Sequence, residues 1–196
     1  MKAVTPCPLE QASCCRGVAE YHPHTEADRI GELHPGEIMD NRFLITEVIS
    51  RSGMAMIFKA QDLLNDNADV ALKVPHLEYE SDPGFFTRFR REEQIGLKLD
   101  HPYILKFLPL PGPKSRPYIV TEYLRGCTVA HLLKAMRPLP EKDALKIAGL
   151  LCEALQYLHD QGITHRDLKP ENVMGGATDR SVCWTSGWPN PTTCGE

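Results

Sequence analysis

The sequence predicts an α+β fold in which a small sheet with one helix is followed by a helical region. Runs of β-branched and apolar residues, separated by polar turns, fill residues 43–123. One helical pattern interrupts these runs after Pro83. Beyond Gly126 the apolar spacing becomes helical. The first part should therefore form a five-stranded antiparallel sheet with one helix.

The chain should begin with an irregular leader, because residues 1–36 contain four scattered prolines and no strand or helix period. The next two strand-like runs, residues 43–49 and 56–60, flank a short Ser/Gly turn and predict a hairpin. Residues 70–74 form a third apolar run that stops at Pro75. Three consecutive strands should therefore open the sheet.

The helical pattern places Phe85, Phe89 and Glu92 at i, i+4 and i+7, so a carboxylate shares one helix face with two aromatic rings. We expect this helix to end near His101 and Pro102, because the residue before a proline avoids the α conformation.

Residues 103–110 and 118–123 have strand-like composition and should complete the sheet across a turn rich in proline and glycine. A short helix over residues 129–136 and a long helix over residues 141–161 should follow. Gly162 should close the long helix. Its apolar stripe consists of Ala144, Ala148, Leu151, Leu155 and Leu158.

Composition excludes several classes of function. Hydrophobic residues make up 42% of the chain, and the formal net charge is −4, so no basic field for nucleic acid is expected. No apolar run approaches the roughly 18–20 residues that cross a bilayer, and we expect a cytoplasmic protein without a membrane segment. The seven cysteines lack the paired spacing of a zinc site and should be reduced thiols.

Residues 165–172 read His-Arg-Asp-Leu-Lys-Pro-Glu-Asn and follow the predicted long helix. These residues match the catalytic loop of protein kinases in register. The chain therefore resembles a protein kinase, and the lysine two residues after the aspartate resembles the serine/threonine branch. The resemblance implies transfer of the ATP γ-phosphoryl group to a Ser or Thr hydroxyl of a protein substrate, with ATP and Mg²⁺ as cofactors. It implies Asp167 as catalytic base, Lys169 as stabiliser of the transferring group and Asn172 as magnesium ligand.

A lysine that holds the ATP phosphates is the second element of the resemblance. Residues 70–73 read Val-Ala-Leu-Lys, which is similar to the third strand of a kinase, and the resemblance implies that Lys73 grips the α- and β-phosphates. A helical carboxylate should hold that lysine. We favour Glu92, which shares the face of the aromatic rings, over Glu93, which points about 100° away.

Residues 50–55, Ser-Arg-Ser-Gly-Met-Ala, align with the glycine-rich loop that covers the phosphates. The signature glycines fall on Ser50, Ser52 and Ala55, and only Gly53 remains glycine. Each added Cβ restricts positive φ and keeps the backbone farther from a phosphate, so nucleotide affinity should be lowered. In a protein whose Asp-Phe-Gly segment is restored, returning the three positions to glycine should lower the KM for ATP and change that for a peptide little.

The same resemblance implies an adenine pocket between the sheet and the helical part. Its residues would be a roof of Ile49, Ile57 and Ala71, a floor of Met174, the gatekeeper Thr121, and the hinge residues Glu122, Tyr123 and Leu124.

The resemblance divides the chain into four parts and is closest to bacterial kinases with eukaryotic-type domains. After the leader, residues 37–124 should form the N-lobe and residues 125–174 an incomplete helical C-lobe with the catalytic loop. Residues 175–196 show no kinase pattern, and the chain looks truncated. Because the Asp-Phe-Gly segment and substrate platform are missing, we expect no phosphotransfer by the 196-residue chain. Part of the long helix's apolar stripe should also face water.

A frameshift is one hypothesis for the tail, and an unrelated natural tail is the alternative. Residues 183–187 can be encoded by TGC TGG ACT TCG GGN, which in another frame contains CTG GAC TTC GGG, or Leu-Asp-Phe-Gly. The hidden aspartate coincides with Thr185. Any other codons at these positions would contradict the hypothesis. Two further interpretations remain open, a non-catalytic ATP-binding or scaffolding pseudokinase and a gene remnant that does not fold.

Overall fold

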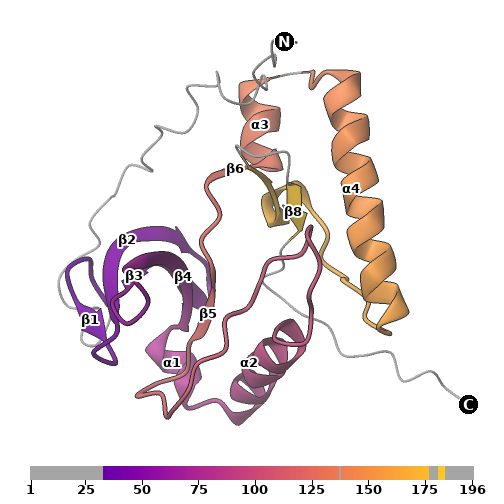
Figure 1. The fold of residues 1–196 in the computed structure, drawn as a ribbon. Helices are drawn as coiled ribbons and strands as arrows, with labels where there is room; N and C mark the ends of the chain where they lie inside the picture. The colour runs from indigo at the N-terminus through magenta and orange to yellow at the C-terminus, as the bar shows by residue number, and fades with distance from the viewer. Residues whose placement is uncertain (1–32, 137, 177–180, 184–196) are drawn as a thin grey trace, which may run out of the picture. The chain divides into compact units, whose positions relative to one another are not determined.

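The computed structural model describes residues 33–136, 138–176 and 181–183 (Figure 1). A curled five-stranded antiparallel sheet in the order β1-β2-β3-β4-β5 forms the first half of this part of the chain. Its strands are β1 (Ile38–Met39), β2 (Phe43–Arg51), β3 (Ala55–Asp62), β4 (Ala68–Pro75) and β5 (Ile119–Glu122). The predicted α+β class, with a five-stranded sheet and one main helix, is therefore confirmed.

The membership of the sheet differs from the prediction at one strand. β1, only two residues long, was not predicted, and the predicted strand at residues 103–110 is not a regular strand. Leu108 N–H donates to Val120 O at 2.9 Å, and Glu122 N–H donates to Lys106 O at 3.0 Å. The ladder does not continue beyond the single bridge between Phe107 and Thr121, and the next acceptor, Tyr118 O, accepts from the Lys114 ammonium at 2.6 Å.

The sheet buries one face through strict alternation. In β3 the residues at even positions are buried and most of those at odd positions are half-buried, as the pleat of a strand requires. The fully buried side chains of this core include Phe43, Ile45, Phe58, Leu72 and Val120. The opposite face of the sheet carries residues of the candidate site described below.

Helix α2 (Pro83–Gly96) packs its aromatic face inward, after the short α1 (Leu77–Glu80). The Asp82 carboxylate caps α2 by accepting from Gly84 N–H at 2.8 Å and Phe85 N–H at 3.2 Å, and Pro83 occupies the first turn. The helix ends at Gly96 and not near residue 101 as predicted. Glycine is a poor helix former, and it ends the helix before the influence of Pro102 begins.

The second half of the chain combines two helices with a three-stranded sheet, β6-β7-β8. Its elements are β6 (Gly126–Thr128), α3 (Val129–Ala135), α4 (Glu141–Asp160), the 3₁₀ turn η4 (Pro170–Asn172), β7 (Val173–Gly176) and β8 (Ser181–Cys183). Gly162 has a φ of 70° and its N–H donates to His159 O, so it closes α4 as predicted. The predicted C-lobe ended at Met174, but regular structure continues past it: β7 contains Met174, and β8 follows it in the chain.

Exposure along α4 follows the expectation that part of its apolar stripe faces water. Leu158 is buried, Leu151 and Leu155 are half-buried, and Ala144 and Ala148 are exposed. In the described residues, no helix is both long and apolar enough to span a bilayer.

Two compact units divide the chain, and each is described here by itself. Among the described residues, one unit contains residues 33–99 and 106–123, which include the five-stranded sheet, and the other contains residues 100–105 and the described residues from Leu124 onward. Residues 100–105 belong with the helices because the Tyr157 hydroxyl accepts from Asp100 N–H at 3.1 Å and its ring lies 4.9 Å from that of His101. Along the chain, the division between the units falls between Tyr123 and Leu124, two of the predicted hinge residues.

An ion pair between Arg42 and Asp62 gives a first prediction, on acid stability. Arg42 donates to both oxygens of buried Asp62 at 2.8 and 2.7 Å, and these hydrogen bonds hold the pKa of Asp62 below its usual value. Because the pKa of Asp62 is lower in the folded state than in the unfolded state, the ion pair stabilises the fold above about pH 4. This stabilisation is lost as the pH falls through the folded-state pKa. Asp62→Asn should therefore cost about 1.5–3 kcal/mol in urea unfolding at pH 7. The cost should shrink below pH 4, and a pH-independent cost would contradict the assignment.

Candidate active site

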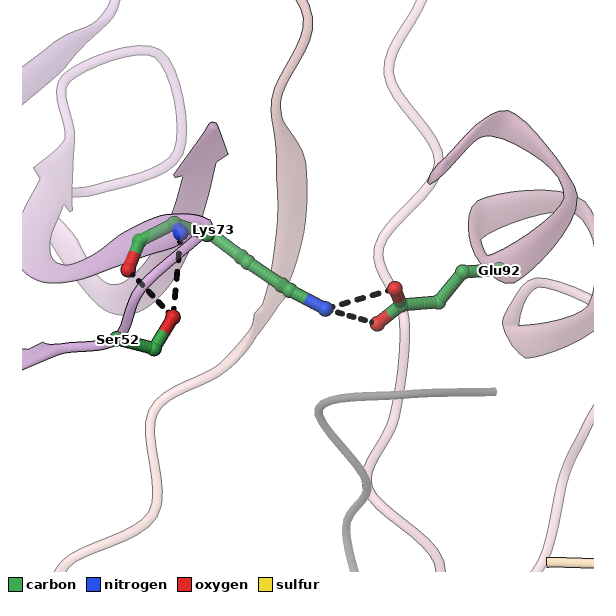
Figure 2. Close-up of polar contacts among 4 residues, drawn as sticks. Ser52, Lys73 and Glu92 are labelled. Carbon is green, nitrogen blue, oxygen red and sulfur yellow. Dashed lines mark hydrogen bonds and ion pairs between the residues drawn. The ribbon is translucent and has the colours of Figure 1, made fainter. Parts of the chain in front are cut away.

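A buried ion pair between β4 and α2 lies at the centre of the sheet unit (Figure 2). Lys73 Nζ lies 2.6 Å from Glu92 Oε1 and 2.7 Å from Oε2, so the carboxylate binds the ammonium with both oxygens. Lys73 is 8% exposed and Glu92 is 6% exposed. Burial raises the pKa of the Glu92 carboxyl, and the Lys73 ammonium opposes that rise. The ammonium also lies 5.8 Å from the centre of the Phe89 ring.

The competing carboxylate, Glu93, has a different partner. Its Oε1 binds the ammonium of Lys114, from the loop before β5. The structure thus brings Lys73 together with Glu92, as the helix period predicted, and Lys114 takes the second carboxylate.

The β2–β3 turn is closed by its own serine. Ser52 Oγ accepts from Ala55 N–H at 3.1 Å and donates to Ala55 O at 2.8 Å, the two bonds drawn at Ser52 in Figure 2. Ser52 N–H donates to the same Ala55 oxygen at 2.9 Å. A ring nitrogen of His76, just after β4, donates to Ser52 O across 2.8 Å. Residues 53 and 54 form the exposed tip between these contacts.

The geometry of the turn removes one reason for the expected loss of affinity. Among the described residues, Ser50, Ser52, Gly53 and Ala55 are absent from those with positive φ. The backbone therefore follows a path on which a Cβ carries no conformational strain. Whether nucleotide affinity is lowered remains a prediction that depends on how closely a phosphate approaches the turn.

Hydrogen exchange can test the role of Ser52 in this turn. Ser52→Ala removes the acceptor of Ala55 N–H, so that amide should exchange about tenfold faster, equivalent to the loss of roughly 1 kcal/mol of protection. Ser50→Ala changes a neighbouring serine and is the matched control, which should leave exchange at Ala55 unchanged. Equal effects of the two substitutions would show that the hydroxyl bonds do not close the turn.

The predicted adenine-pocket residues of the sheet unit lie on neighbouring strands. Ile57 is the partner of Lys73 in the β3–β4 ladder, and Ala71 is the partner of Thr121 in the β4–β5 ladder. Ile49 is 45% exposed, whereas Thr121 is buried. Ile57, Ala71 and Thr121 thus lie beside Lys73 in the ladders of the sheet.

The main chain at the predicted hinge is partly engaged. Glu122 N–H already donates to Lys106 O, and the Glu122 side chain accepts from Lys106 N–H at 3.0 Å. Tyr123 lies against the ammonium of Lys59, 4.7 Å from the ring centre. A base at this edge would therefore bond to Tyr123 or Leu124 backbone more readily than to Glu122 N–H. Leu124 and Met174 belong to the helical unit, where Met174 is half-buried in β7.

In the helical unit, residues 165–172 form a compact loop around Asp167. Asn172 Nδ2 donates to Asp167 O at 2.8 Å and to Oδ2 at 3.0 Å, and Lys169 Nζ lies 3.1 Å from Oδ2. The bond to Lys169 contributes most to holding the pKa of Asp167 below its usual value, so the carboxylate is ionised near neutral pH. The predicted residues of the catalytic loop are therefore brought together.

Two features of the main chain shape this loop. His165 is buried, and burial lowers its pKa, so its imidazole is neutral near pH 7. Arg166 has a φ of 60°, a left-handed conformation that is uncommon for a residue other than glycine. Backbone strain of this kind is retained mainly where the surroundings fix a functional geometry.

The oxygen atoms of the loop fit a magnesium ion. Asn172 must direct its nitrogen at Asp167 O, because a carbonyl can only accept, so its Oδ1 remains the atom available to a cation. Amide and carboxylate oxygens are the ligands that Mg²⁺ prefers. Asn172 would hold the ion through Oδ1, and the ion would neutralise phosphate charge.

Together, the sheet with its Lys73–Glu92 pair and the loop around Asp167 define a protein kinase. The family described as protein kinase domain matches residues 46–182, and the chain belongs to this family. The match continues past Met174, where the sequence resemblance was expected to stop. The predicted membership of the bacterial-type serine/threonine protein kinases is confirmed by the similar proteins.

The chain is 37% identical to "Serine/threonine-protein kinase PrkC" of Bacillus subtilis over 139 residues, which covers 71% of the chain and 21% of that protein. It is 36% identical to "Serine/threonine-protein kinase PknB" of Mycobacterium tuberculosis over 145 residues, covering 72% and 23%. The crystal structure of the Mycobacterium tuberculosis PknI kinase domain has a TM-score of 0.65 at 27% identity, covering 78% of the chain and 62% of that chain. The chain thus spans about a fifth of the length of these curated relatives.

Sequence reasoning missed two residues around the site, Lys114 and His76, and did not predict the turn-closing role of Ser52. Lys114 lay in a stretch interpreted only as a turn, although two adjacent glutamates on α2 are a signal for two cationic partners. Ser52 was treated only as a lost glycine, although serine closes turns through its hydroxyl. His76 gave no local signal. Thr185, on which the frameshift hypothesis depends, lies outside the described residues.

Proposed function

We propose that this chain contributes the ATP-binding half and the catalytic loop of an enzyme that transfers the γ-phosphoryl group of ATP to a Ser or Thr hydroxyl of a protein. The observation that carries the proposal is the buried, two-oxygen ion pair between Lys73 and Glu92. Burying two charged groups costs free energy through desolvation, so a buried ion pair points to a function that retains it. This pair holds an ammonium in a fixed position where it can bind an anionic ligand.

Each group has a chemical role in this proposal. Lys73 binds the α- and β-phosphates, and Glu92 keeps its ammonium in place. Gly53 and Met54, at the exposed tip of the β2–β3 turn, offer backbone N–H groups to the phosphates. In the other unit, ionised Asp167 orients the acceptor hydroxyl and receives its proton, while Lys169 offsets charge on the transferring group. A catalytic part that consumes ATP belongs in the cytoplasm.

Thermal unfolding with and without Mg-ATP tests the proposal. A ligand at 100 times its Kd adds about 2.7 kcal/mol to the free energy of unfolding, so saturating Mg-ATP should raise the Tm by several degrees. Lys73→Met should abolish most of that rise. No rise in the unsubstituted chain, with a cooperative transition present, would contradict nucleotide binding. The absence of any cooperative transition would favour the gene-remnant interpretation.

A second candidate function is a non-catalytic nucleotide-binding or scaffolding domain. It is favoured by a β2–β3 turn that lacks the signature glycines and is closed on itself by Ser52. A polypeptide limited to these 196 residues should in either case bind ATP without phosphorylating a basic protein substrate, because Asp-Phe-Gly does not occur in it. Phosphorylation that is abolished by Asp167→Ala would contradict that expectation.

A further inference from the structure

Helix α2 carries two adjacent carboxylates, and each binds a lysine from a different segment of the sheet unit. Glu92 binds Lys73 of β4, and Glu93 binds Lys114 of the loop before β5. Adjacent residues project about 100° apart around a helix. The two ion pairs therefore hold α2 in two directions, which resists rotation of the helix about its own axis.

Lys114 is itself fixed to the sheet. Its ammonium donates to Tyr118 O at 2.6 Å and lies 4.8 Å from the centre of the Tyr118 ring. Tyr118 is 3% exposed, and its hydroxyl donates to Asp40 Oδ2 at 2.7 Å. Because the Lys114 ammonium is bound to a buried residue, it is fixed relative to the sheet. It can therefore fix the position of the Glu93 carboxylate that it binds.

The contacts of Lys114 also connect to Lys73 through the sheet. Tyr118 directly precedes Ile119, and Ile119 is the partner of Lys73 in the β4–β5 ladder. Both lysines are thus positioned by the same part of the sheet, one from each side of the carboxylate pair. A rotation of α2 that moved Glu92 away from Lys73 would also have to break the pair of Glu93 and Lys114.

We propose that Lys114 is a positioning residue for the ATP-binding site: with Glu93 it fixes the rotation of α2 and so keeps Glu92 against Lys73. The inference rests on the proposed role of Lys73 as the phosphate-binding residue. Lys114 touches neither substrate nor nucleotide, and it acts only through the helix.

The alternative is an ordinary surface ion pair with no effect beyond itself. The sheet offers a matched control, because Lys59 and Asp69 form a pair at 3.3 Å whose side chains are 25% and 21% exposed. The side chains of Lys114 and Glu93 are 21% and 25% exposed. The two pairs thus have equal exposure, but Lys59 and Asp69 both lie in strands and do not hold α2.

The experiment measures acetylation of Lys73 by a small N-hydroxysuccinimide ester without nucleotide, normalised to exposed Lys98 by mass spectrometry of the full chain. Glu93→Gln and Lys114→Met should each raise Lys73 acetylation about two- to fivefold, as expected for the loss of a partly buried ion pair. The double variant should equal the single variants, because both remove the same pair. Lys114→Arg should retain protection, and Asp69→Asn should leave acetylation unchanged.

Unchanged Lys73 acetylation in Glu93→Gln and Lys114→Met would overturn the proposal, as would an equal rise in Asp69→Asn. The result is separable from nucleotide binding. If Mg-ATP fails to protect Lys73 in the unsubstituted chain but the variants still raise acetylation, the proposed function fails and the positioning role stands. If Mg-ATP protects Lys73 and the variants have no effect, only the positioning role fails.

Discussion

Replacing Glu92 with Ala should lower the free energy of unfolding by about 3–5 kcal/mol, the largest effect expected of any single substitution in the sheet unit. The variant leaves the Lys73 ammonium 8% exposed and without this carboxylate. Removing one partner of a buried pair costs more than removing both, because an apolar replacement leaves no buried charge.

The double variant Lys73→Met/Glu92→Leu separates this cause from loss of packing. It should recover most of the lost stability in urea unfolding at neutral pH, although it should bind no nucleotide. A single variant that fails to fold beside a double variant that folds would support the same conclusion. Equal destabilisation of the single and double variants would contradict a dominant role for charge burial.

Replacing Gly96 with Ala should also have a large effect, through overpacking. A Cβ at Gly96 would overlap three ring atoms of Phe107 more closely than real Cβ contacts allow, and Phe107 is 4% exposed. The ring cannot move cheaply inside a packed core, so we expect a cost of about 1–3 kcal/mol. Because Gly96 is one helical turn after Glu92, the displaced helix should also raise the Kd for Mg-ATP.

Two comparisons isolate the contact between Gly96 and Phe107. Gly149→Ala in α4 introduces a Cβ with no atom within 4 Å and should stabilise the helix by up to about 1 kcal/mol. Gly96→Ala/Phe107→Leu should recover part of the loss, because the smaller side chain makes room. If Gly96→Ala is stabilising in chemical denaturation, as Gly149→Ala should be, the close contact does not exist in solution.

Local patterns were enough to predict the catalytic loop and the partner of Lys73. Residues 165–172 form a contiguous motif, so its members are brought together by chain connectivity. Glu92 was chosen because only one of two adjacent glutamates can share the face of Phe85 and Phe89, and because its spacing to His101 and Pro102 resembles that of the kinase family. In the structure both oxygens of Glu92 bind the Lys73 ammonium, so the helix period correctly predicted which glutamate faces Lys73.

Long-range contacts and very short elements could not be predicted in the same way. β1 has two residues, too few for any period to appear, and its pairing with β2 supplies the fifth strand. Residues 103–110 looked like a strand in composition, but only a single bridge, between Phe107 and Thr121, joins them to β5. Lys114 reaches a carboxylate 21 residues away in sequence, and no local pattern links the two.

An acyl-phosphate derivative of ATP gives the most direct test of the proposed ATP site, because it transfers its acyl group to an amine beside the bound phosphates. Mass spectrometry of the labelled chain should find the acyl group on Lys73, and an excess of Mg-ATP should suppress the labelling. Glu92→Gln should reduce it, because the ammonium is no longer held in place. Labelling spread over exposed lysines, or labelling of Lys73 that Mg-ATP does not suppress, would contradict an ATP site at Lys73.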